Sequence, residues 1–129
     1  MATILVMEED LQCRRAFRGV LTQAGYAVME AQNAPEAIYY AQQHHIDLVI
    51  VPLLRPMALS VATLRSLRTV APRIRLLALW DRGRTGSRDG QRCAQLGGAD
   101  RVLELPGDET RVLGTIQELL ADGPGAAGG

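Results

Sequence analysis

The chain has 129 residues, of which 47% are hydrophobic and 22% are charged. This composition is typical of one compact globular domain and excludes a disordered or collagen-like chain. Fourteen basic residues balance fourteen acidic ones, which excludes the positive field of a protein held mainly by nucleic acid phosphates or anionic lipid. Every basic residue is an arginine, so chemistry that needs a lysine is excluded as well.

The two cysteines, Cys13 and Cys93, are too few for a disulfide framework and lack CxxC spacing, which favours a reducing compartment. The N-terminal stretch MATILVM lacks the basic start of a signal peptide, and no apolar run approaches a membrane span. We therefore expect a cytoplasmic protein that binds neither membrane nor nucleic acid.

Short apolar runs alternate with amphipathic stretches along the chain. In chain order, the apolar runs predict strands at Thr3–Met7, Tyr26–Ala31, Ile46–Val51, Ile74–Trp80 and Arg101–Leu105. Spacings of three and four residues predict helices at Cys13–Ala24, after the cap residue Asn33, at Ser60–Val70, near Gln91–Leu96 and at Asp108–Leu120. Strand and helix therefore alternate five times.

Two segments show neither pattern. DRGRTGSRDG, residues 81–90, is rich in Gly, Arg and Asp and predicts a mobile loop. Its glycines lack the spacing of a phosphate-binding loop. The Gly-rich segment 122–129 predicts a flexible tail or linker stub, which leaves residues 1–121 as the domain.

Strands that alternate with helices and connect through right-handed crossovers form a parallel sheet covered on both faces. We expect an α/β fold with a five-stranded parallel sheet and five flanking helices. Ligands of such sheets bind at the carboxyl ends of the strands. The segments that reach this edge are Glu8–Asp10, Pro52–Pro56, Trp80–Arg84 and Leu105–Pro106.

Four segments carry a family resemblance, which covers Thr3–Leu120. In order along the chain, ILVMEED, AGYAV, DLVIVPLLRP and GGADRVLELP resemble the receiver domain of bacterial two-component response regulators. The resemblance implies a flavodoxin-like fold with strand order 2-1-3-4-5 and a role in phosphorelay signal transduction. It also implies a kinase, phosphotransferase or effector as partner, and a homodimer surface on the fourth helix, fifth strand and fifth helix.

The resemblance also places the family's site on this chain. In receivers, an acidic pair after the first strand holds Mg²⁺, and here it falls on Glu8 and Glu9, with Asp10 beside them. The phosphate-accepting aspartate falls on Pro52, which has no nucleophilic atom. The hydroxyl residue of the fourth strand falls on Trp80, and the lysine of the fifth strand falls on Leu105.

Only the acidic positions keep their chemistry, so we expect no catalytic residue, no cofactor and no Mg²⁺ site of the usual kind. Pro52, Trp80 and Leu105 are predicted to form an apolar plug in the former pocket. The alternative is that Trp80 points into solvent or toward a partner.

Two crowded carboxylates need compensation when they are buried. Arg55 and Arg82 are the candidates for an ion pair with Glu8 and Glu9, and solvated acids are the alternative. The resemblance further implies a cis peptide before Pro106.

These features favour a pseudo-receiver, a receiver-fold module that is not an enzyme, is not phosphorylated and acts by docking to proteins. One alternative is a small-molecule sensor with an apolar site beside Trp80. Another is a competent receiver that uses Ser60 or Asp81 as the acceptor.

Overall fold

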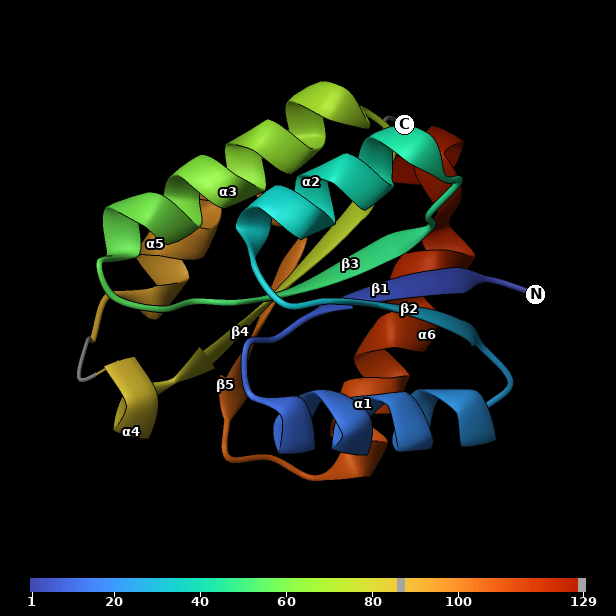
Figure 1. The fold of residues 1–129 in the computed structure, drawn as a ribbon, viewed down its shortest axis with the longest axis horizontal. Coiled ribbons are helices and arrows are strands. Elements are labelled where there is room, and N and C mark those ends of the chain that lie inside the picture. Colours follow the sequence, from blue (N-terminus) through green and yellow to red (C-terminus); the bar gives the residue numbers. More distant parts are fainter. Residues whose placement is uncertain (86–87, 128–129) are drawn as a thin grey trace.

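The computed structural model of the chain describes residues 1–85 and 88–127, and Figure 1 shows its layered architecture. Five parallel strands form one sheet in the order β2-β1-β3-β4-β5. They are β1 (Thr3–Met7), β2 (Ala27–Ala31), β3 (Leu48–Pro52), β4 (Arg75–Asp81) and β5 (Arg101–Leu105). The predicted α/β fold and strand order are confirmed, and each strand begins and ends within two residues of its predicted position.

Helices cover both faces of the sheet. They are α1 (Leu11–Gln23), α2 (Ala34–Gln43), α3 (Met57–Val70), α4 (Arg82–Thr85), α5 (Gly90–Gly97) and α6 (Glu109–Ala127). In Figure 1, α1 and α6 lie on one face, and α2, α3 and α5 lie on the other. The short helix α4 lies beyond the end of β4. The sequence predicted five helices, and α4 is the additional one.

The strands are apolar on both faces because each face is covered by helices. Alternate residues of a strand point to opposite faces, and this alternation sorts the core into two clusters. Leu5, Val49, Ala78 and Trp80 belong to the cluster under α2, α3 and α5. Ile4, Val6, Ile50, Leu77 and Ile116 belong to the cluster under α1 and α6.

Part of the segment predicted as a mobile loop is ordered as α4. The Oδ1 atom of Asp81 accepts a hydrogen bond from the backbone N–H of Gly83 over 2.9 Å, and the hydroxyl of Thr85 donates to the carbonyl of Asp81 over 3.2 Å. These short-range bonds fix one helical turn, which composition alone does not predict. Residues 86–87 of the predicted loop lie outside the described residues.

The predicted tail also needs a correction. Helix α6 continues to Ala127, so residues 122–127 are helical, and only Gly128 and Gly129 of the predicted tail lie outside the described part of the chain. This extension continues a helix that is already packed against the sheet. Its packing comes from Val112, Ile116 and Leu119, which are buried against the sheet.

Candidate functional site

Glu8 lies directly after β1 at the carboxyl edge of the sheet and is 4% exposed. Nη1 of Arg84 donates to Oε1 of Glu8 over 2.7 Å, and Nη2 lies 3.4 Å from Oε2. The backbone N–H of Asp10 donates to Oε2 over 2.9 Å. A buried carboxylate is costly unless it is paired and hydrogen-bonded, and Arg84 meets this need. The hydrogen bond to Glu8 in turn raises the pKa of Arg84.

The structure gives Arg82 a different role from the predicted one. Its Nε lies 3.0 Å from Oε1 of Glu104, and its guanidinium carbon lies 4.8 Å from the centroid of the Trp80 ring. Arg82 and Arg84 are two positions apart in the helical turn of α4, and such residues do not face the same way. The prediction of Arg82 as the partner of the acidic pair is therefore wrong, because only Arg84 faces Glu8.

A small hollow of about 190 Å³ lies at the edge formed by β1 and β3, and Glu8, Glu9, Pro52 and Arg55 all contribute to its wall. Pro52 is buried at the end of β3, in register with Leu79 of β4. Arg55 forms no ion pair with Glu8 or Glu9, all three of which are described residues. The predicted Arg55 pair is therefore absent, since Arg84 already compensates the buried carboxylate.

The other two acidic residues have separate environments. Asp10 caps α1, because its Oδ1 accepts a hydrogen bond from the backbone N–H of Cys13 over 2.9 Å. This backbone hydrogen bond lowers the pKa of Asp10. Glu9 is exposed at the surface. Of the three acids that follow β1, only Glu8 is therefore held inside the site.

Arg14 of α1 supports the backbone at the end of β1. It is 7% exposed, and its Nη1 donates to the carbonyl of Glu8 over 2.8 Å. Its Nε donates to Oε1 of Glu30 over 3.1 Å, while Nη1 of Arg18 donates to Oε2 of Glu30 over 2.7 Å. The bond from Arg18, followed by that from Arg14, lowers the pKa of Glu30. Glu8 is thus fixed from its backbone as well as from its side chain.

Trp80 is buried, with 5% of its surface exposed. A Cβ atom added at Gly90 would lie 2.0 Å from Cδ2 of the Trp80 ring, so the first residue of α5 packs directly on the indole. Arg82 stacks on the same ring. The predicted alternative, in which Trp80 points into solvent, is wrong because α5 covers the ring.

The three residues predicted as one plug do not form one. Trp80 is in register with Glu104, and Asp81 is in register with Leu105, so the side chains of Trp80 and Leu105 point to opposite faces of the sheet. Trp80 packs in the cluster under α2, α3 and α5, whereas Leu105 packs against the cluster under α1 and α6. The peptide bond between Leu105 and Pro106 is cis, as is the bond before Pro56.

The comparison with protein families decides the identity of this fold. The response regulator receiver domain matches residues 4–117. The chain belongs to the receiver domain family. It is therefore a receiver domain of a two-component signalling system. In the described part of the chain, no helix is long and apolar enough to cross a membrane.

Individual relatives agree with this assignment. The transcriptional regulatory protein ResD of Bacillus subtilis is 32% identical over 65 residues, which are 50% of this chain and 27% of ResD. A receiver domain from Methanospirillum hungatei has a similar structure, with a TM-score of 0.83 and 20% identity over 95% of both chains. The chemotaxis protein CheY4 of Vibrio cholerae has a TM-score of 0.80 and 24% identity, over 93% of this chain and 99% of CheY4. At these identities the two structures show the fold alone.

The side chains of Glu8 and Pro52 do not fit Mg²⁺, which needs near-octahedral coordination by oxygen. Both carboxylate oxygens of Glu8 accept hydrogen bonds from Arg84 or Asp10. Pro52 offers no side-chain oxygen, and the guanidinium of Arg84 would repel a second cation at the same carboxylate. The described residues contain no group of three or more His, Cys, Asp and Glu side chains that could hold a metal ion.

Two arginines that organise the carboxyl edge of the receiver domain, Arg14 and Arg84, were not predicted from the sequence. Arg84 lies in a segment whose composition predicts a loop, so no periodicity indicated which way its side chain points. Arg14 lies next to Arg15 on α1, and the sequence does not show that one is buried and the other exposed. Charge balance was the available signal, because a buried Glu8 requires a cation near it.

Proposed function

We propose that this receiver domain is a pseudo-receiver, which accepts no phosphoryl group and acts by docking to protein partners. Phosphoryl transfer to a protein needs a positioned nucleophilic oxygen and positive charge around the transferred group. Pro52, Trp80 and Leu105 occupy the positions that the family resemblance assigns to the acceptor, the hydroxyl residue and the lysine. None of these side chains can perform the corresponding step.

The observation that carries the proposal is the ion pair between Glu8 and Arg84 beside Pro52. The pair supplies a permanent positive charge, held by a hydrogen bond of 2.7 Å, at the carboxylate that corresponds to a metal ligand in receivers. Because the guanidinium of Arg84 already neutralises Glu8, neither a metal ion nor a phosphoryl group is needed to balance this carboxylate. The ion pair therefore supports a site whose conformation does not depend on phosphorylation.

Other acceptors are unfavourable in this geometry. Ser60 is 7% exposed, and its hydroxyl both accepts from the backbone N–H of Leu54 over 2.9 Å and donates to the carbonyl of Leu54 over 3.0 Å. Asp81 uses Oδ1 to hold the turn of α4 through Gly83. Both residues therefore have structural roles that phosphorylation would disturb.

The test is intact-mass measurement after incubation with acetyl phosphate and Mg²⁺. We expect the mass of the chain to stay unchanged, while a receiver domain that has an aspartate at the end of its third strand gains one phosphoryl group under the same conditions. An adduct on this chain would overturn the pseudo-receiver proposal. Peptide mapping would then show whether Ser60, Asp81 or another residue carries it.

For docking we propose the surface formed by α5, β5 and α6, with a kinase, a phosphotransferase, an effector or a second copy of the chain as the partner. Strand β5 is at the edge of the sheet, and Leu96 of α5 is 51% exposed. An edge strand presents backbone N–H and C=O groups with which a second chain can pair. Leu59 of α3 is 63% exposed, lies outside this surface and provides the matched control.

The docking test compares the proteins that the wild type, L96D and L59D capture from the native cell, with quantification by mass spectrometry. A partner at the proposed surface should be reduced roughly tenfold with L96D, because a charge would be buried in the interface, and should be retained with L59D. Equal capture by all three chains would exclude the surface. The alternative of a ligand beside Trp80 gains no support, since α5 and Arg82 cover the ring.

A further inference from the structure

Arg75, the first residue of β4, carries a buried guanidinium whose hydrogen bonds are incomplete. The residue is 6% exposed, and its Nε and Nη2 atoms have no hydrogen-bond partner among the described residues. Its Nη1 lies 3.9 Å from Oδ1 of Asp100, which is too long for a hydrogen bond. Buried polar groups in native proteins are almost always paired, and a buried charge is costly unless it has a counter-charge.

Asp100 is only a partial counter-charge for Arg75, because it makes no hydrogen bond to Arg75 and is shared with other donors. Nη2 of Arg68 and the backbone N–H of Leu76 each donate to Oδ2 of Asp100 over 2.8 Å. Asp100 thus neutralises Arg68 first. Arg75 remains a cation with two N–H-bearing atoms that the described residues leave unbonded.

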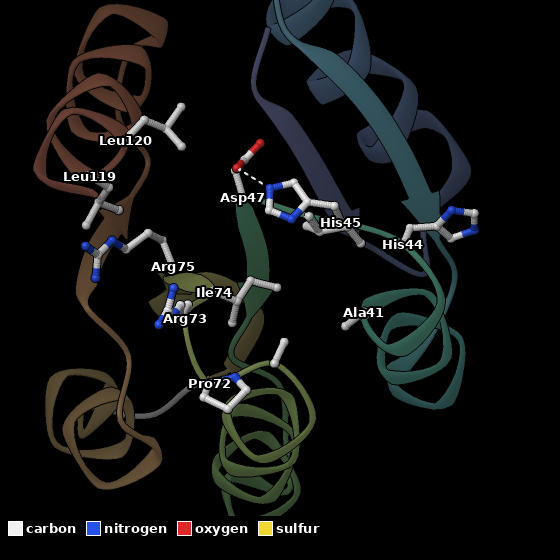
Figure 2. A pocket seen from close by; sticks show the side chains of 12 residues that line it. Ala41, His44, His45, Asp47, Pro72, Arg73, Ile74, Arg75, Leu119 and Leu120 are labelled. Carbon is white, nitrogen blue, oxygen red and sulfur yellow. Dashed lines mark hydrogen bonds and ion pairs between the residues drawn. The ribbon is translucent and has the colours of Figure 1, made fainter. Parts of the chain in front are cut away.

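The same arginine lines a hollow of about 580 Å³ at the amino ends of the strands, opposite to the carboxyl edge that carries Glu8 and Pro52. Figure 2 shows Arg75 extending from β4 toward Leu119 of α6, on the side of the hollow away from Ala41 and His44. The remaining wall is mixed, and its apolar part includes Ile46, Ile74 and Leu120. The volume falls in the range of small-molecule sites, which combine an apolar lining with a few polar groups.

The charged groups around the hollow leave it positive. Asp47 accepts from the backbone N–H of Thr3 over 2.8 Å, and its other oxygen lies 3.1 Å from Nε2 of His45, an interaction drawn in Figure 2. Arg73 also lines the hollow and makes no ion pair with a described residue. Among the residues that line the hollow, two arginines therefore accompany one carboxylate, which already accepts hydrogen bonds.

We propose that this hollow binds a small organic anion. The ligand has an apolar body and one carboxylate or phosphate group, and that group pairs with the guanidinium of Arg75. A guanidinium presents a planar fork of donors that fits either group in a bidentate manner. The apolar part of the wall would hold the body of the ligand, and Arg73 and His45 would stand beside it. This site is independent of the proposed pseudo-receiver function, because it lies at the other edge of the sheet.

The test is titration of the ¹⁵N-labelled chain with phenyl phosphate, benzoate and inorganic phosphate, each at constant ionic strength with sodium chloride as the reference. We expect saturable shifts of backbone amides at residues 44–47, 73–75 and 119–120. Phenyl phosphate or benzoate should bind several-fold more tightly than inorganic phosphate, because the ring buries apolar surface. The tighter of the two organic anions shows whether phosphate or carboxylate is the preferred group.

Arg75→Met keeps the length of the side chain and removes the charge. It should weaken binding roughly tenfold or more, because charge-assisted hydrogen bonds are lost. Without added anion the variant should be as stable as the wild type or more stable, because a buried charge with incomplete hydrogen bonding has been removed. Arg101→Met is the matched control, since Arg101 pairs with Glu118 at the surface, and it should leave binding unchanged.

Three results would overturn the site. One is the absence of saturable shifts in the wild-type chain, a measurement that requires no variant to fold. Another is equal shifts in the wild type and Arg75→Met. The third is a pattern in which the backbone amides of all surface arginines shift alike and chloride causes the same shifts as the organic anions. Such a pattern indicates charge screening only.

Discussion

Arg84 and Glu8 are 76 positions apart in the chain and are joined by a hydrogen bond of 2.7 Å. The bond connects α4, which follows β4, to Glu8, which follows β1. Glu8 is 5% exposed in its side chain, while that of Arg84 is 40% exposed. The carboxylate therefore depends on the arginine more than the arginine depends on the carboxylate.

Arg84→Met should destabilise the domain by about 1–3 kcal/mol, because it leaves a buried carboxylate with one partner fewer. Denaturant unfolding measures this change. Arg101→Met removes an exposed pair with Glu118 and should cost less than about 0.5 kcal/mol. In a double-mutant cycle with Glu8→Gln, a coupling energy near zero would contradict the role given to the pair.

Gly90→Ala should destabilise the domain by about 1–3 kcal/mol, because the new methyl group overlaps the ring of Trp80. The matched control is Gly19→Ala in the exposed middle of α1, where a Cβ meets no atom within 4 Å. That change should stabilise the domain by about 0.5–1 kcal/mol, since alanine favours helix. Pairing Gly90→Ala with Trp80→Leu should recover part of the loss, and no recovery would mean that the ring is not the obstacle.

Arg14→Met should cost about 1–3 kcal/mol, because the carbonyl of Glu8 and the carboxylate of Glu30 each lose a charged donor. Arg15→Met, at the exposed neighbouring position, should change stability by less than about 0.5 kcal/mol. Thermal or denaturant unfolding of the two variants gives the comparison. Similar losses at both positions would show that the helix as a whole, rather than the buried contact, is responsible.

The acid dependence of stability should include Glu30. Arg18 and Arg14 lower the pKa of this carboxyl below its ordinary value of 4.5, so folding favours the charged form. The resulting stabilisation is fully present above about pH 4.5 and is lost as the pH falls through the lowered pKa of the folded state.

Glu30→Gln should therefore be less stable than the wild type by about 1 kcal/mol at neutral pH, since the pair is only partly buried. The difference should shrink as the pH falls below about 4.5. Urea unfolding of both chains between neutral pH and about pH 3 measures it. A difference that stays constant over this range would show that charge on Glu30 is not the cause.

The order of elements and the fold class were determined by the sequence, because burial on both faces of a parallel sheet requires continuous apolar runs such as Thr3–Met7 and Ile46–Val51. Asn33 was also predictable as a cap, and its Oδ1 accepts from the backbone N–H of Glu36. These features depend on neighbours within one or two turns of chain. The family resemblance also showed, position by position, that Pro52, Trp80 and Leu105 replace the residues of the receiver site.

Only the tertiary structure decided which arginine meets Glu8, which face of the sheet receives Trp80, and that Arg75 is buried without a full set of partners. Arg82 and Arg84 look alike in sequence, but they are two positions apart in one helical turn and their side chains point in different directions. The register of β4 against β5 puts Trp80 and Leu105 on opposite faces. The pairing of charges depends on distances between segments that are far apart in the chain, and local patterns of hydrophobicity do not encode those distances.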